Sequence, residues 1–189
     1  MALPPSSQEM IKEAVQQILL ALGEDPNREG LLRTPERVAK MFSDVLDGNH
    51  SRPPIPTTFE ELDGVPDQVV THNTPFYAYC EHHMAIFTGT VAIGYVPKDN
   101  RVIGLSKLVR IFRYYCKRPT IQERIGMLTI KAILAHTNGA ICQITAEHTC
   151  MSLRGIKSAG ARTTTLTFNG AYSSNADLIH DFKKSIKNG

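Results

Sequence analysis

The sequence has 189 residues, of which 42% are hydrophobic and 21% are charged, as in an ordinary globular domain. This length supports a hydrophobic core without disulfides, and no apolar run reaches the ~20 residues needed to span a bilayer. The net charge of +3 is too small for a typical nucleic-acid binder. Because the first residues lack a basic segment followed by an apolar one, we expect a cytoplasmic protein with four free cysteines.

Two amphipathic helices are predicted in the first quarter of the chain. Apolar residues recur at helical spacing over residues 8–22, and a second helix is predicted to begin at Thr34, its expected N-cap. The proline-rich stretch 51–56 predicts a linker. We therefore expect residues 1–56 to form a helical appendage with its linker, and residues 57–189 to form the main domain.

The main domain is predicted to contain a block of strands, then two helices, then more strands. Strands are expected at residues 87–96, 101–103, 140–150 and 163–169. One helix is expected from Ser106 to before Pro119, and another from Thr120 to Asn138. Because parallel strands require a strict alternation of strands and helices, this order predicts an α+β fold with an antiparallel sheet.

Two short motifs carry groups that bind zinc. Cys80, His82 and His83 belong to a Cys-Glu-His-His sequence, and His148 and Cys150 are two residues apart at the end of a predicted strand. Residues two apart in a strand share a face, so these last two should point the same way. A structural zinc site takes four ligands, whereas a catalytic site takes three and keeps a water. The surplus of imidazoles favours a catalytic site, because spare histidines exchange protons near neutral pH.

A second group of residues is suited to an anionic ligand. Lys107 lies at a predicted helix start, Arg110 follows one turn later, and Arg154 and Lys157 come shortly after Cys150. A helix N-terminus adds free N–H groups and a favourable dipole. The alternative is that each is an ordinary solvated surface charge.

Glu123 has two interpretations. It is the third residue after Thr120, the spacing of a capping box, which sequence spacing alone favours. The other interpretation is a carboxylate that accepts two N–H donors from the edge of a purine.

These motifs belong to a series of segments that resembles the zinc-dependent GTP cyclohydrolase I family. The segments come in the order found in the family and are spread over roughly residues 20–170. They are Thr34–Lys40, Cys80–His83, Val102–Leu108, Ile121–Arg124, His148–Met151 and Arg154-Gly155. The chain departs from the family pattern at Met84–Phe87 and at Ala78, and no proposed ligand is affected.

The resemblance implies a role for each candidate residue. The implied zinc ligands are Cys80, His83 and Cys150. The implied catalytic groups are His82, His148, which would protonate N7 of guanine, and Ser106, which would contact the ribose. The implied substrate ligands are Glu123 and Gln122 for guanine, and Lys107, Arg110, Arg154 and Arg37 for the triphosphate.

The resemblance also implies an activity and a fold. The family converts GTP and water to formate and 7,8-dihydroneopterin triphosphate, the first step of pterin and tetrahydrofolate biosynthesis. Its tunnelling-fold unit has a four-stranded antiparallel sheet with two helices on one face, preceded by N-terminal helices. Two stacked rings of subunits form a homodecamer with active sites at subunit boundaries. The rival functions are an NADPH-dependent 7-cyano-7-deazaguanine reductase with a nucleophilic cysteine, and a zinc-stabilised binding protein without activity.

Overall fold

The computed structural model describes residues 3–188 and divides into two compact units, residues 1–52 and 53–189. The first unit contains α1 (Pro5–Ala21), α2 (Thr34–Val45) and the short 3-10 helix η1 (Asp47–Asn49). Helix α2 begins where the sequence predicts, but its N-cap residue is Arg33 and Thr34 makes no capping hydrogen bond. Among the described residues, none of the helices combines the length and the apolar character that a membrane span requires.

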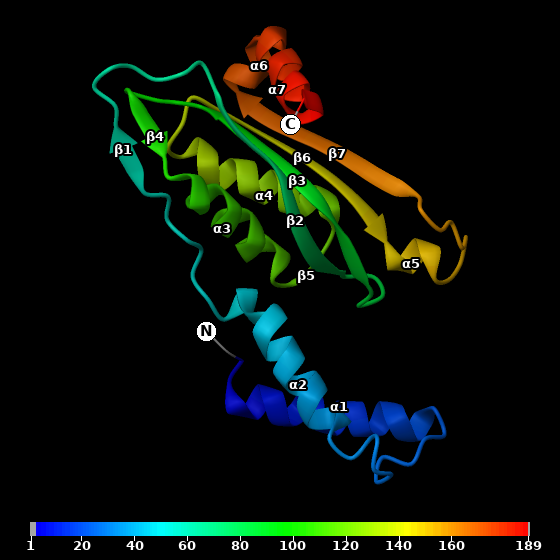
Figure 1. Cartoon of the computed structure of the whole chain (residues 1–189). Helices are drawn as coiled ribbons and strands as arrows, with labels where there is room; N and C mark the ends of the chain where they lie inside the picture. Colours follow the sequence, from blue (N-terminus) through cyan, green and yellow to red (C-terminus); the bar gives the residue numbers. More distant parts are fainter. Residues whose placement is uncertain (1–2, 189) are drawn as a thin grey trace. The chain divides into compact units, whose positions relative to one another are not determined.

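The second unit is built around a five-stranded sheet in the order β5-β2-β3-β6-β7 (Figure 1). Its sheet strands are β2 (Val69–Cys80), β3 (Ile86–Val96), β5 (Pro119–Thr120), β6 (Gly139–His148) and β7 (Arg162–Gly170). A separate two-stranded ribbon joins β1 (Thr58–Glu60) to β4 (Arg101–Ile103). The helices are α3 (Leu105–Cys116), α4 (Gln122–Leu134), α5 (Thr149–Ser152), α6 (Ala171–Ser174) and α7 (Ala176–Asn188).

The α+β class is confirmed, but the four-stranded antiparallel sheet is wrong. The fifth strand, β5, has two residues and pairs in parallel with Tyr79 and Cys80 at the end of β2. A two-residue strand is too short to show an alternating pattern, so the sequence gives no signal for it. Helices α3 and α4 lie together on one face of the sheet, as expected, and α3 covers β2 while α4 covers β6 and β7.

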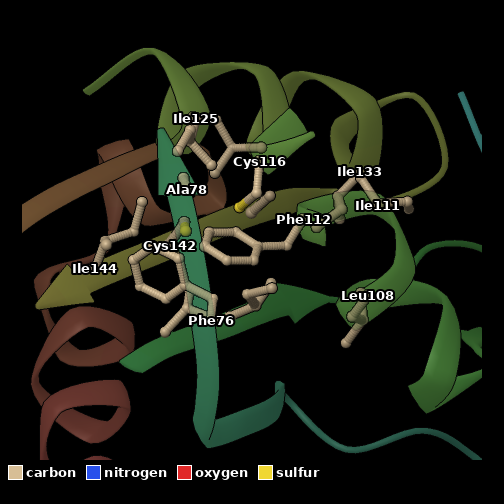
Figure 2. Close-up of a cluster of buried hydrophobic side chains, with 14 of the residues drawn as sticks. Phe76, Ala78, Leu108, Ile111, Phe112, Cys116, Ile125, Ile133, Cys142 and Ile144 are labelled. Carbon is tan, nitrogen blue, oxygen red and sulfur yellow. The ribbon is translucent and has the colours of Figure 1, made fainter. Parts of the chain in front are cut away.

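Alternation along β6 separates two buried clusters on opposite faces of the sheet. Cys142 and Ile144 face α3 and α4, whereas Ile141 packs with Phe182 of α7 on the other face. Figure 2 shows Phe112 of α3 above Phe76 of β2, and their ring centroids are 5.1 Å apart in an edge-to-face contact. Helices α3 and α4 therefore cover one face of the sheet, and the C-terminal helices cover one end of the opposite face.

A bulge in β2 decides which of its residues face the core. Thr71 pairs with Ile93 and Thr74 pairs with Val91, so β2 contains one extra residue, and Asn73 there has a φ of 52°. An extra residue reverses the side-chain alternation beyond it. Before the bulge, Val69 faces α3 and α4. After it, the residues that face these helices are Phe76, Ala78 and Cys80.

Candidate active site

The turn between β2 and β3 carries the first candidate ligands. Cys80 ends β2, its N–H donates to the carbonyl of Ala85 at 2.8 Å, and its carbonyl accepts from Met84 N–H at 2.9 Å. The N–H of Glu81 donates to the carbonyl of Thr120 in β5 at 3.1 Å. The turn is thus held to both neighbouring strands, and it places His82 and His83 at this end of the sheet.

Three candidate ligand groups come together there. One ligand atom each from Cys80, His83 and Cys150 lies within 4.8 Å of the other two. Zinc bonds of 2.0–2.3 Å place tetrahedral ligands about 3–4 Å apart, so the group fits zinc once the three ligand atoms move slightly closer together. Burial, followed by the neighbouring Cys80, raises the pKa of Cys150, and a bound divalent cation would reverse that effect.

The route by which Cys150 reaches this cluster differs from the prediction. Strand β6 ends at His148, and Cys150 lies in α5, which follows directly. Strand alternation therefore does not relate the two side chains. The change from strand to helix is fixed by Thr149, whose hydroxyl donates to the carbonyl of Ile86 at 2.6 Å.

A pocket of about 290 Å³ adjoins the cluster. Its walls include Cys80, His82, Gln122, Glu123, His148 and Cys150. This volume is at the lower end of the range for ligand pockets.

The two histidines outside the ligand group are held differently. His148 is half-buried, stacks on Phe87 with ring centroids 4.4 Å apart, and has its Nε2 2.9 Å from Gln122 Oε1. Burial lowers the pKa of His148, and the nearby carboxylate of Glu123 opposes this by raising it. His82 is exposed, and its Nδ1 is 3.6 Å from the sulfur of Cys80.

The capping interpretation of Glu123 is wrong. Helix α4 begins at Gln122 with Ile121 as N-cap, and no side chain caps it. Thr120 instead lies buried in β5, and its hydroxyl bonds to the carbonyl of Ile121. Glu123 is therefore an exposed carboxylate in the first turn of α4, at the pocket wall.

The predicted phosphate ligands of the second unit are not all gathered at this pocket. Arg154 is close, because its guanidinium contacts Nε2 of His83. Lys107 lies near the start of α3, about 13 Å along the helix axis from Cys116, whose end of the helix leads into β5. Ser106 and Arg110 lie in the same first half of α3, and Arg37 is an exposed residue of α2 in the first unit.

One contact at the site was not anticipated from the sequence. Arg124 of α4 forms a two-pronged ion pair with Glu81 in the ligand turn. The Arg124 hydrogen bond lowers the pKa of the Glu81 carboxyl. Glu81 and Arg124 both belong to segments that resemble the family, and each is next to a candidate site residue. The sequence offers no other signal for this contact.

Two sulfurs and an imidazole beside a pocket with further histidines and a carboxylate form a donor set suited to a catalytic zinc site, which defines a candidate zinc enzyme. The model of the GTP cyclohydrolase I family matches residues 11–187. A protein of Finegoldia magna named GTP cyclohydrolase 1 is 42% identical over 177 residues, covering 92% of this chain and 95% of its own length. A protein of Streptococcus mutans with the same name is 44% identical over 167 residues, covering 87% of each chain.

The chain therefore belongs to the GTP cyclohydrolase I family. Among solved structures, an archaeosine synthase QueF-like protein in the apo form aligns with a TM-score of 0.43 and 13% identity. That alignment covers 57% of this chain and 97% of the other, and a likeness this remote adds nothing to the assignment.

Proposed function

We propose that the chain opens the imidazole ring of GTP with a zinc ion held by Cys80, His83 and Cys150. As a member of its family the chain is a hydrolase, and the products are formate and 7,8-dihydroneopterin triphosphate. The observation that carries the zinc assignment is the group of three ligand atoms within 4.8 Å of one another. When bound there, Zn²⁺ would lower the pKa of a water in its open position toward ~7, which supplies a nucleophile for C8 of guanine.

The two remaining histidines handle protons in this proposal. Protonation of N7 makes C8 of guanine electrophilic, and His148 lines the pocket with its ring held by Phe87 and Gln122. His82 is exposed beside Cys80, where it can exchange protons with solvent during ring opening and formate release.

Glu123 recognises the base. Its exposed carboxylate at the pocket wall is an acceptor for the N1–H and the 2-amino group of guanine. Adenine lacks the N1–H donor, so a site built around this carboxylate rejects it.

A second copy of the chain completes the site. Lys107, Arg110 and Ser106 lie at the far end of α3 from Cys80, whereas Arg154 is beside His83. Within the described residues, β7 pairs with β6 alone, and β2 has β5 beside it only at its last two residues. Unpaired strand edges of this kind favour pairing with another chain.

We therefore infer a tunnelling-type unit whose sheets join into the rings of a homodecamer. A neighbouring subunit then supplies Lys107, Arg110 and Ser106 to the triphosphate and the ribose, with Arg37 as a further phosphate contact.

The test is to incubate purified protein with GTP, with and without a zinc chelator, and to follow formate and the fluorescent oxidised pterin. We expect both products in equal amounts, both lost on chelation and both restored by Zn²⁺. Cys150→Ala should abolish zinc binding and turnover, whereas Cys116→Ala, a change at a buried core thiol, should preserve both. Neither product from zinc-loaded, assembled protein would overturn the proposal, and oxidation of NADPH by a deazaguanine nitrile would favour the reductase.

A further inference from the structure

We propose that Gln122 is a positioning residue that fixes the tautomer and orientation of His148, and that it does not read the guanine ring. The inference rests on the proposed proton transfer by His148.

The amide of Gln122 is oriented by its surroundings. The side chain is only 1% exposed, and its Nε2 lies 3.1 Å from each of three oxygens, the carbonyls of Ile144 and Thr163 and the hydroxyl of Thr165. Main-chain carbonyls only accept hydrogen bonds, so the NH₂ group must face them. The amide oxygen is thereby directed at His148.

This orientation selects one tautomer of His148. Gln122 Oε1 is 2.9 Å from His148 Nε2, and an amide oxygen can only accept, so Nε2 carries the hydrogen. In the neutral ring the lone pair is then on Nδ1, which becomes the nitrogen that exchanges a proton with a bound purine. The His148 ring also stacks on Phe87, with 7° between the ring planes, and this contact keeps the imidazole from tilting out of its plane.

The same contacts remove Gln122 from base recognition. Both ends of its amide have partners within the protein, and the side chain has almost no accessible surface to offer a ligand. The adjacent Glu123 is exposed and lines the pocket, so it is the residue of this pair that a guanine ring can contact. A buried glutamine that accepts a hydrogen bond from a histidine is typical of a residue that orients an acid–base group.

The experiment measures kcat, KM and GTP affinity for Gln122→Met, which has a similar size but cannot hydrogen-bond. We expect kcat to fall about 10- to 100-fold, as for other partners that orient a site group, with KM and GTP affinity within about twofold. Zinc content should stay native. Thr165→Val removes one anchor of the amide nitrogen and leaves the bond to His148, so its kcat should stay within about threefold of native.

A double-mutant cycle separates positioning from a general structural role. In a His148→Ala background, Gln122→Met should cost no further activity, because its effect passes through the imidazole. Further loss in that background, or a raised KM with native kcat in the single variant, would overturn the inference. An unchanged kcat in His148→Ala alone would instead overturn the proposed proton transfer.

Gln122→Glu provides a second measurement if the methionine variant fails to assemble. Its carboxyl keeps an acceptor facing Nε2 but sets an oxygen against the carbonyls of Ile144 and Thr163, so kcat should fall while KM and GTP affinity stay within about twofold of native. A raised KM with native kcat in an assembled, zinc-loaded Gln122→Glu protein would count against the inference, because it would show that this side chain contacts the base.

Discussion

The carboxylate of Glu123 is the one exposed acidic group in the first turn of α4, and its loss should affect substrate more than metal. Hydrogen bonds to charged groups contribute about 1.5–3 kcal/mol, so Glu123→Gln should lower kcat/KM for GTP by about 10- to 150-fold. Zinc content, measured by atomic absorption, should be unchanged. Asp177→Asn is the matched control, because Asp177 is an exposed acid in the first turn of α7. A parallel loss of zinc in Glu123→Gln would show a structural role instead.

At the level of single residues, the sequence predicts which side chains come together. It is a poorer guide to the local structure that brings them together. Two local motifs supply five candidate ligands, and the resemblance selects Cys80, His83 and Cys150, which the structure brings together. Strand alternation gives the wrong reason for Cys150, because the chain turns into α5 first. The burial of Gln122 depends on carbonyls of β6 and β7, and such contacts between distant segments leave no trace in local spacing.

At the level of elements, the sequence predicts most of the regular helices and strands of the main domain, but not the irregular strand β2 or the C-terminal helix. Helices α3 and α4 and strand β3 lie close to their predicted positions. Strand β2 has no clear sequence signal, because the bulge at Asn73 breaks its alternation and Pro75 argues against a strand. Helix α7 is not among the predicted elements, although Leu178, Phe182 and Ile186 recur at helical spacing on the face that packs against the sheet.

The attachment of the C-terminal helices depends on a buried hydroxyl. Tyr172 of α6 is 1% exposed, and its hydroxyl donates to Gln68 Oε1 at 2.9 Å. Tyr172→Phe should therefore lower the free energy of unfolding by about 1 kcal/mol near neutral pH. Tyr77→Phe, at a tyrosine that is 52% exposed, should cost little.

The cost of Tyr172→Phe should shrink at high pH. Burial raises the pKa of Tyr172 above its unfolded value of about 10. The folded state then holds the phenolic proton more tightly, so this contribution to stability is complete below about pH 10 and declines as the pH rises further. Denaturant unfolding at about pH 7.5 and about pH 10.5 measures the difference between the native chain and the variant. An equal difference at both pH values would contradict a buried, proton-retaining Tyr172.

At the scale of the whole molecule, the candidate site is split between two ends of the same unit. The candidate metal ligands lie where β2 and β6 end, and the cationic residues of α3 lie toward β4 (Figure 1). Helix α3 is packed along β2 through Phe112 and Phe76, so bending cannot bring its first turn to Cys80 without breaking the core. Local sequence patterns identify both the candidate metal ligands and the cationic residues. They do not show that these two groups lie at opposite ends of one chain's main domain.

A mixed oligomer tests whether two copies share one site. Cys150→Ala removes a proposed metal ligand and Arg110→Ala removes a proposed phosphate ligand, so each variant alone should lose most of its activity. Random assembly of equal amounts gives about one site in four with Cys150 from one copy and Arg110 from its neighbour, and should restore about a quarter of native activity. Co-expression with two affinity tags isolates the mixed assemblies, and a mixture of separately assembled variants without exchange is the control. If both residues served the same chain's pocket, every site in the mixed assembly would lack one of them and no activity would return.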